Sequence, residues 1–213
     1  MKGLLLKDFL ILKECKQVVL LFLFYIIISF LTNNFSFVSA ILIMYTTIFV
    51  LTTFSYDAYS KWEKYSLCFP VSRKELVLSK YLFFLLLLGG AVFISLALSF
   101  SFFLFINQTP NKELILETIF SILGIVTYAV FFVSVMFPIV FKIGIEKSRT
   151  FMMIIMAVPF LFFGFLGYNH MLPFEELSEQ MFIVFLCALF LLSLCALFAS
   201  FFLSLKFFVK KDL

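Results

Sequence analysis

Residues 76–106 read LVLSKYLFFLLLLGGAVFISLALSFSFFLFI, a continuously apolar run whose one charged residue, Lys80, lies near its start. About 20 mostly apolar residues are enough for a helix to cross a bilayer. This run is longer, so we expect a helix that projects beyond the bilayer.

Of the 213 residues in the whole chain, 64% are hydrophobic and only 13% are charged. A water-soluble domain does not need so much apolar surface. The sequence therefore predicts an integral membrane protein.

Five further stretches are long and apolar enough to cross a bilayer, or nearly so. They are residues 16–31, 35–56, 114–141, 150–168 and 181–208. All six runs are continuously apolar and lack the alternating pattern of strands in an outer-membrane barrel. We therefore predict an all-α integral membrane protein with six transmembrane helices, forming a single transmembrane domain over residues 1–213.

The basic residues are distributed very unevenly between the segments that join these spans. Fifteen of the sixteen Lys and Arg residues fall at the two ends of the chain, between spans two and three, or between spans four and five. The segments on the other side carry Lys112 alone, together with five acidic residues. Because cytoplasmic loops are enriched in Lys and Arg, both termini are predicted to be cytoplasmic. The net charge of +4 is explained by this topology and does not indicate binding to nucleic acid.

The N-terminal segment, residues 1–15, mixes Leu, Phe and Ile with Lys, Asp8 and Glu14. A cleavable signal peptide has no such acids and ends in a small-residue cleavage site. We therefore predict a short helix that lies in the cytoplasmic interface before the first span.

Catalytic and metal-binding chemistry is not evident. The apolar interiors of the spans carry no charged residue, which disfavours a carrier coupled to protons or sodium. The single histidine, His170, lies in an outer loop near Glu175 and Glu176, where a solvated loop is a better explanation than a metal site. A phosphate-binding loop and a Gly-x-Ser-x-Gly nucleophile motif are both absent. We expect no catalytic residue, no metal and no cofactor in this chain, which would not be an enzyme by itself.

The segment between spans two and three is the most distinctive part of the chain. Helix-forming residues over 57–67 place Ala58, Trp62 and Tyr65 on one face, and Pro70 would end that helix. Ser72 and Glu75 have the spacing of a capping box that starts the next helix. Two interpretations of the helix remain open: an interfacial helix anchored at the headgroups, or a coupling helix that docks on a cytoplasmic partner. The candidate partner-binding residues are Asp57, Lys61, Trp62, Glu63, Lys64 and Tyr65, followed by Pro70, Ser72, Arg73 and Glu75 at the start of the next helix.

Two features lie inside the spans. Ser39, Thr46 and Thr53 recur every seven residues along the second span and so share a face. Small hydroxyl residues allow close helix approach, so this face would serve internal helix packing, a subunit interface or a pathway wall. Pro138 and Pro159 each remove a backbone hydrogen bond and would kink their helices. These kinks could be gating hinges or static bends.

The run Met1–Asp8 (MKGLLLKD), residues 62–65 (WEKY), 70–74 (PVSRK) and 79–82 (SKYL) resemble the pattern of six-span ABC-2 type permeases. The resemblance covers the whole chain in layout. Within the family, the chain is similar to small permeases of bacterial peptide and toxin exporters. It implies a bacterial plasma-membrane protein that works with two cytoplasmic ABC ATPase subunits and a second permease, identical or homologous. ATP and Mg²⁺ would bind in the ATPase and not in this chain.

Two functions from different classes follow from these observations. The first is the permease of an ATP-driven exporter that moves amphipathic or hydrophobic cargo, such as peptides or toxins, out of the cytoplasm or inner leaflet. The second is a structural or regulatory membrane protein whose helix 57–67 recruits a partner that is not an ATPase. An intramembrane enzyme is a weaker third possibility, because no catalytic constellation is visible.

Overall fold

The computed structural model describes residues 2–14, 36–66, 68–105, 112–168 and 179–210. Every regular element in these ranges is helical, in keeping with the need of a chain in lipid to satisfy its backbone hydrogen bonds within each segment. The helices are α1 (Lys2–Glu14), α3 (Ser36–Tyr59), α4 (Trp62–Ser66), α5 (Arg73–Phe105), α6 (Lys112–Ile143), α7 (Ile145–Tyr168) and α8 (Glu179–Val209).

Within the described ranges, four helices are long and apolar enough to cross a membrane. Their apolar parts are Ser39–Tyr59, Arg73–Ser101, Ile115–Ile143 and Ile183–Val209, which match the second, third, fourth and sixth predicted spans. Helix α7 covers the fifth predicted span but is not among the four. The first predicted span, residues 16–31, lies outside the described residues, so the six-span arrangement stays a prediction.

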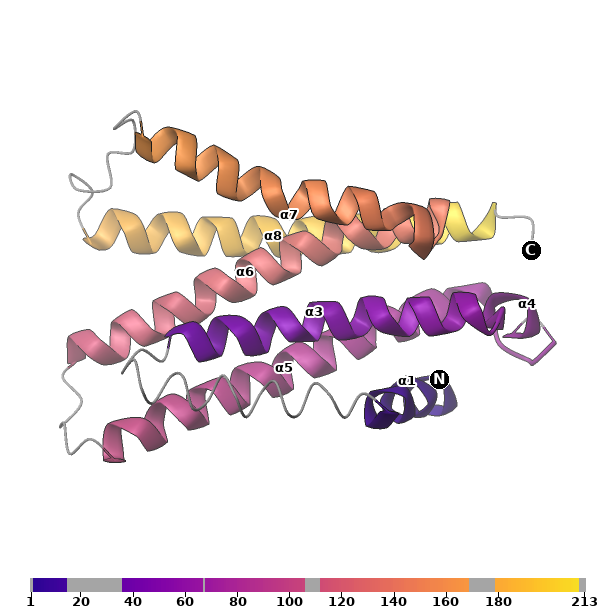
Figure 1. The fold of residues 1–213 in the computed structure, drawn as a ribbon, viewed down its shortest axis with the longest axis horizontal. Helices are drawn as coiled ribbons and strands as arrows, with labels where there is room; N and C mark the ends of the chain where they lie inside the picture. Colours follow the sequence, from indigo (N-terminus) through magenta and orange to yellow (C-terminus); the bar gives the residue numbers. More distant parts are fainter. Residues whose placement is uncertain (1, 15–35, 67, 106–111, 169–178, 211–213) are drawn as a thin grey trace.

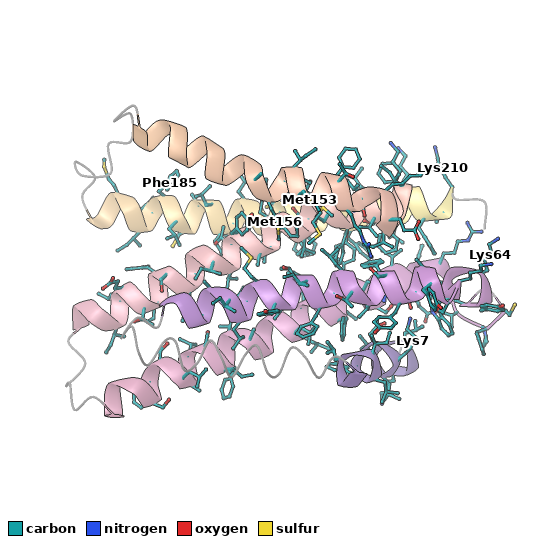
Figure 2. The ribbon with its side chains drawn as sticks, viewed as in Figure 1. Lys7, Lys64, Met153, Met156, Phe185 and Lys210 are labelled. Carbon is teal, nitrogen blue, oxygen red and sulfur yellow. The ribbon has the colours of Figure 1, made fainter. Side chains whose placement is uncertain are left out.

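The long helices form an elongated bundle (Figure 1). Helix α6 packs against α8, α3 and α7, while α5 packs against α3 and α8. At one end of this bundle, α1 lies against α5 and α3, and α4 lies against α3. That same end carries the labelled basic residues Lys7, Lys64 and Lys210 (Figure 2). The segments that the sequence assigned to one side of the membrane therefore gather at one end, which we call the basic end.

The core is built from aromatic side chains shared between helices. Phe137 of α6 is fully buried, and its ring centroid lies 5.4 Å from that of Phe54 and 4.8 Å from that of Tyr81. Both pairs adopt the edge-to-face geometry that aromatic rings favour. Phe137 thus joins α3, α5 and α6 near the basic end.

Helix α8 shows how small residues permit close packing. Its buried positions include Ser193, Ser200 and Ser204, whereas its opposite face exposes large apolar residues such as Phe198 and Phe202. Serines let helix backbones approach closely in a membrane. The exposed apolar face is free to contact lipid or another subunit.

The turn between α6 and α7 depends on Gly144, whose φ of 86° is left-handed. Its N–H donates to the carbonyl of Val140 at 2.8 Å and closes the last turn of α6. Pro138 lies within α6 and Pro159 within α7, and both helices continue through them. Their proposed role as hinges stays a prediction.

The predicted single helix over residues 57–67 is wrong. Asp57 belongs to the last turn of α3, Lys61 has a left-handed φ of 52°, and α4 begins only at Trp62. In a continuous helix, residues five apart point about 140° away from each other. Asp57 and Trp62 could not then both face the bundle, as they do here. The break at Lys61 turns Trp62 inward.

The predicted start of the following helix is confirmed. Ser72 N–H donates to Glu75 Oε2 at 2.8 Å, and Glu75 N–H donates to Ser72 Oγ at 3.3 Å. These reciprocal bonds form a capping box, and α5 begins at Arg73. Pro70 lies in the turn before it.

Candidate functional site at the basic end

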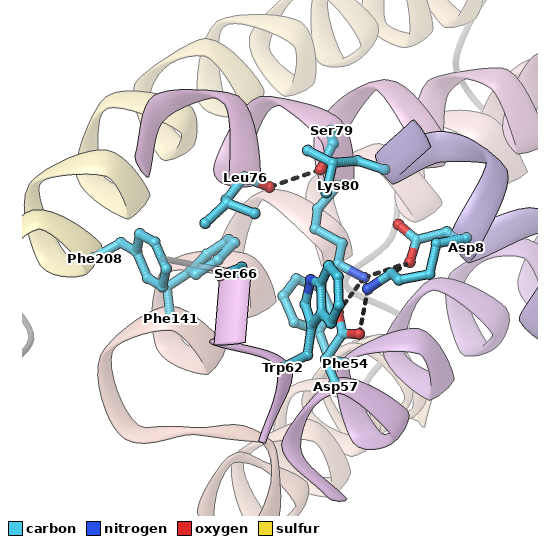
Figure 3. A pocket seen from close by; sticks show the side chains of 12 residues that line it. Asp8, Phe54, Asp57, Trp62, Ser66, Leu76, Ser79, Lys80, Phe141 and Phe208 are labelled. Carbon is cyan, nitrogen blue, oxygen red and sulfur yellow. Dashed lines mark hydrogen bonds and ion pairs between the residues drawn. The ribbon is translucent and has the colours of Figure 1, made fainter. Parts of the chain in front are cut away.

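Four charged side chains meet where α1, α3 and α5 come together (Figure 3). We call Lys7, Asp8, Asp57 and Lys80 the charge cluster. Lys80 Nζ lies 2.9 Å from Asp8 Oδ1 and 2.7 Å from Asp57 Oδ2. Lys7 Nζ is paired with Asp57 and lies 3.4 Å from Asp8 Oδ1. Each cation therefore contacts both carboxylates, and the four charges form a closed, electrically neutral ring.

The charge cluster is largely removed from solvent. Asp8 is 1% exposed, Lys80 6% and Asp57 7%. Charges taken out of water are costly unless they are paired and hydrogen-bonded. Lys80 meets this need fully, because it also donates to Thr53 Oγ1 at 3.1 Å and lies 5.1 Å from the ring centroid of Phe54.

Of the two carboxylate oxygens of Asp8, Oδ1 is the one that the lysines contact. Its Oδ2 has no hydrogen-bond partner among the described residues. A partly open pocket of about 30 Å³ lies beside the charge cluster, a volume of about one water molecule. Asp8 Oδ2 itself has almost no surface accessible to water, so among the described residues this oxygen is buried without a partner.

This cluster was not predicted from the sequence, in which Lys80 contributes only to the cytoplasmic positive charge. Lys80 lies two turns inside α5, where a lone ammonium group in apolar surroundings costs at least about 2.5 kcal/mol. That cost was a signal that Lys80 needs an acidic partner. Asp8 and Asp57 were the available acids on the same side, but nothing in the sequence pairs residues 72 positions apart.

Trp62 faces the inside of the basic end. The ring centroid of Trp62 lies 4.7 Å from Lys7 Nζ, a cation–π contact, and 6.1 Å from the ring of Phe69. Beside these side chains is an open pocket of about 250 Å³, lined by residues of α1, by Trp62 and Ser66 of α4, and by residues 69–71. Trp62 therefore joins α4 to α1.

Other residues of the segment 59–69 point outward. Tyr59 is 91% exposed, Tyr65 60% and Phe69 55%, and Lys61 and Lys64 are also exposed. We call these five residues the aromatic tip. A surface of aromatic side chains flanked by cations is the composition of a protein-binding hot spot.

The predicted partner-binding residues are thus divided by the structure. Lys61, Lys64 and Tyr65 lie on the surface, whereas Asp57 and Trp62 face inward. Glu63 lies within α4. Tyr59 and Phe69 were not predicted as binding residues. Phe69 directly precedes Pro70, where the helix was expected to have ended, but Tyr59 lay inside the predicted helix.

Arg73 connects the start of α5 to the end of α8. Its Nη1 donates to the carbonyl of Val209 at 2.6 Å and to that of Phe208 at 3.5 Å. These are last-turn carbonyls that lack partners within their own helix, and a cation is favourable there. The segment that carries the aromatic tip is therefore held to the end of α8.

The hydroxyl face of α3 is buried within this chain. Ser39 is 3% exposed, Thr46 7% and Thr53 0%. Thr46 and Thr53 donate to carbonyls of their own helix, at 2.6 Å and 2.7 Å. This placement is what internal helix packing requires, and a role in an interface or pathway stays a prediction.

A second polar contact ties α5 to α8 deeper in the bundle. The hydroxyl of Tyr81 lies 2.7 Å from Ser200 Oγ and 2.8 Å from Ser204 Oγ. Because interhelical hydrogen bonds in membranes average about 0.6 kcal/mol each, Tyr81→Phe is expected to lower the free energy of unfolding by about 1 kcal/mol. Thermal unfolding in detergent measures this loss.

The matched control is Tyr128→Phe. The Tyr128 hydroxyl is buried without a hydrogen-bond partner among the described residues, so its removal should leave stability unchanged or slightly raised. Equal losses for both variants would contradict a specific role for the Tyr81 contacts.

Across the described ranges, no three His, Cys, Asp or Glu side chains are grouped so that they could hold a metal ion. The model of a family described as "ABC-2 family transporter protein" matches residues 3–209, nearly the whole chain. No curated protein and no solved structure matches the chain.

Proposed function

Since this chain belongs to the ABC-2 family of transporter proteins and is therefore a permease component of an ABC transporter, we propose that it exports amphipathic or hydrophobic cargo. Membership implies that a separate ABC ATPase subunit works with it in a membrane. ATP and Mg²⁺ act in that ATPase, and this chain contributes the membrane path and no catalytic residue.

The aromatic tip is the observation that carries this proposal. It presents Tyr59, Tyr65 and Phe69 at the basic end. Tyr59 is the last residue of the apolar part of α3, and Tyr65 and Phe69 follow it in the chain. A partner in water can reach these side chains there. The tip is also attached at two places, because Trp62 contacts Lys7 of α1 and Arg73, at the start of α5, is bonded to the end of α8. Movement of a docked ATPase would then be transmitted to the spans.

The basic end faces the cytoplasm of a bacterial cell, and the chain lies in the plasma membrane with both termini inside. This orientation is supported by the positions of Lys7, Lys64 and Lys210 at the end where α1 begins and α8 ends (Figure 2). It places the aromatic tip on the side where ATP is available.

A second permease chain, identical or homologous, completes the transporter, which holds two ATPase subunits. The exposed apolar surface supports this arrangement. Only 17% of the most apolar window of α8 is buried within the chain, so much of this helix is available to lipid or to another subunit.

The cargo is an amphipathic peptide or a comparably hydrophobic molecule that leaves from the cytoplasm or the inner leaflet. The proposal is supported by the apolar character of the described spans, whose charged residues lie near their ends. An apolar path suits such cargo better than a small ion, which needs polar ligands along its way.

Co-purification in a mild detergent tests this function directly. We expect the tagged chain to recover an ATPase with a phosphate-binding loop, and native mass spectrometry to give two permeases with two ATPases. Inside-out vesicles holding the complex should accumulate a fluorescent amphipathic peptide only with ATP. Recovery of a partner that is not an ATPase would instead support the regulatory alternative.

The aromatic tip should be essential for this assembly. Tyr59→Ala together with Tyr65→Ala is expected to weaken ATPase binding by at least about 30-fold, because an interface hot spot contributes about 2 kcal/mol or more. Binding of the purified ATPase to the permease in nanodiscs measures the change.

The control is Phe93→Ala, another exposed aromatic residue at 74% exposure, which lies well inside α5. Its removal should leave ATPase binding unchanged. If both tip tyrosines can be removed without loss of binding, the ATPase docks elsewhere.

A further inference from the structure

Helix α1 is attached to the bundle by two kinds of contact. Leu4 is buried at 8% exposure, and the ring of Phe9 lies 5.2 Å from that of Phe83 in α5. The other kind of contact is made by charged groups: α1 supplies Lys7 and Asp8 to the charge cluster, and Lys7 also contacts the ring of Trp62. The bundle supplies Asp57 and Lys80.

The charges are divided evenly between these two bodies. Each contributes one cation and one carboxylate, so the boundary between α1 and the bundle cuts the ring into two neutral halves. The bundle half already holds its own ion pair, since Lys80 Nζ lies 2.7 Å from Asp57 Oδ2. The α1 half consists of adjacent residues whose charges lie 3.4 Å apart.

This division has an energetic consequence. When one partner of a buried ion pair is removed, the charge left behind is uncompensated and costly. If α1 leaves the bundle, however, Lys80 keeps Asp57 and the hydroxyl of Thr53, at 3.1 Å. Lys7 and Asp8 enter the solvated interface together. No ammonium or carboxylate group is stranded in an apolar site.

We propose that α1 is a detachable element that leaves and rejoins the bundle as a unit, with the Asp57–Lys80 pair kept intact in both states. Because the Trp62 ring contacts Lys7, undocking of α1 also releases the inner side of α4. Helix α1 would thereby control how rigidly the aromatic tip is held. This inference concerns the movement of α1 and stands whether or not the chain exports a peptide.

Cysteine labelling in membranes detects the undocked state. In the full-length chain with its own four cysteines replaced by serine, Leu4→Cys reports on the buried face of α1. Leu6→Cys is the matched control, since Leu6 lies on the same helix and is 63% exposed. With a charged maleimide in permeabilised membranes, we expect Leu4→Cys to react more slowly than Leu6→Cys, but to completion.

Four double variants separate pairing from the effect of each substitution. K7Q with D8N, or D57N with K80Q, leaves an ion pair within one body. D8N with K80Q, or K7Q with D57N, leaves an ion pair across the boundary. The first two variants form one class, with the remaining pair within one body, and the last two form the other, with the remaining pair across the boundary. Each variant removes one positive and one negative charge, and each of the four residues is replaced once in each class. The effects of the single substitutions on the docking of α1 therefore cancel when the two classes are compared.

We expect Leu4→Cys to be labelled at least about tenfold faster when the remaining pair lies within one body, since only a pair across the boundary resists undocking. Thermal unfolding shows whether each of the four variants is folded, and the labelling rates are compared between the two complete classes, because the costs of the single substitutions cancel only there. Equal labelling rates in the two classes would overturn the proposal. So would a Leu4→Cys that stays unlabelled in the wild-type charge background while Leu6→Cys reacts fully.

Discussion

Lys80→Met is expected to lower the free energy of unfolding by about 3–5 kcal/mol, because it leaves two buried carboxylates to share Lys7. Asp8 and Asp57 are 1% and 7% exposed, so water cannot replace the lost ammonium group unless the structure opens. The thermal unfolding midpoint of the purified chain in detergent should therefore fall clearly.

Two comparisons make this test specific. Lys74→Met changes an exposed lysine of the same helix and should have little effect, because exposed charges contribute little to stability. Adding Asp57→Asn to Lys80→Met removes the surplus carboxylate and should recover much of the loss. Equal destabilisation by Lys74→Met and Lys80→Met would show that the charge cluster has no special importance.

Phe137→Ala is expected to destabilise the bundle by about 3–5 kcal/mol, the cost of emptying a well-packed aromatic site. Phe137 is fully buried, and its ring contacts Phe54, Tyr81 and Phe84 at centroid distances of 5.4, 4.8 and 6.2 Å. Helix association in lipid depends on van der Waals packing, and lipid cannot enter a cavity enclosed by three helices. Thermal unfolding again measures the loss.

Phe131→Ala serves as the control, since Phe131 lies on the same helix but is 45% exposed. Where lipid or detergent can take the place of the lost ring, the cost should stay within about 1 kcal/mol. A loss of similar size in both variants would mean that the core around Phe137 is not closely packed.

Much of the local structure was predictable because it depends on residues close in sequence. Continuous apolar runs predicted helices that match α3, α5, α6 and α8. The spacing of Ser72 and Glu75 predicted the start of α5, which is confirmed at Arg73. The uneven distribution of Lys and Arg predicted that the basic segments gather on one side, and they meet at one end of the bundle.

Helix periodicity predicts the wrong local structure at residues 57–67. The pattern of residues 57–67 suits an amphipathic helix, yet the helix is interrupted at Lys61, which has a left-handed φ. Local propensity favours continuing the helix, but the ion pairs of Asp57 with Lys80 and Lys7, together with the contact of Trp62 with Lys7, require both side chains to face inward. These tertiary contacts outweigh the strain of one left-handed residue, which is about 1–3 kcal/mol.

By itself, the sequence determined the helical class, the apolar spans, the clustering of basic segments and the family, since these depend on composition and on spacing within a few turns. Only the tertiary structure decided that Lys80 lies between Asp8 and Asp57, that Trp62 faces α1, and that Tyr59, Tyr65 and Phe69 are left exposed. The physical reason is that an ion pair between α1 and α5 is set by how the helices dock. Docking is a property of whole surfaces and not of neighbouring residues.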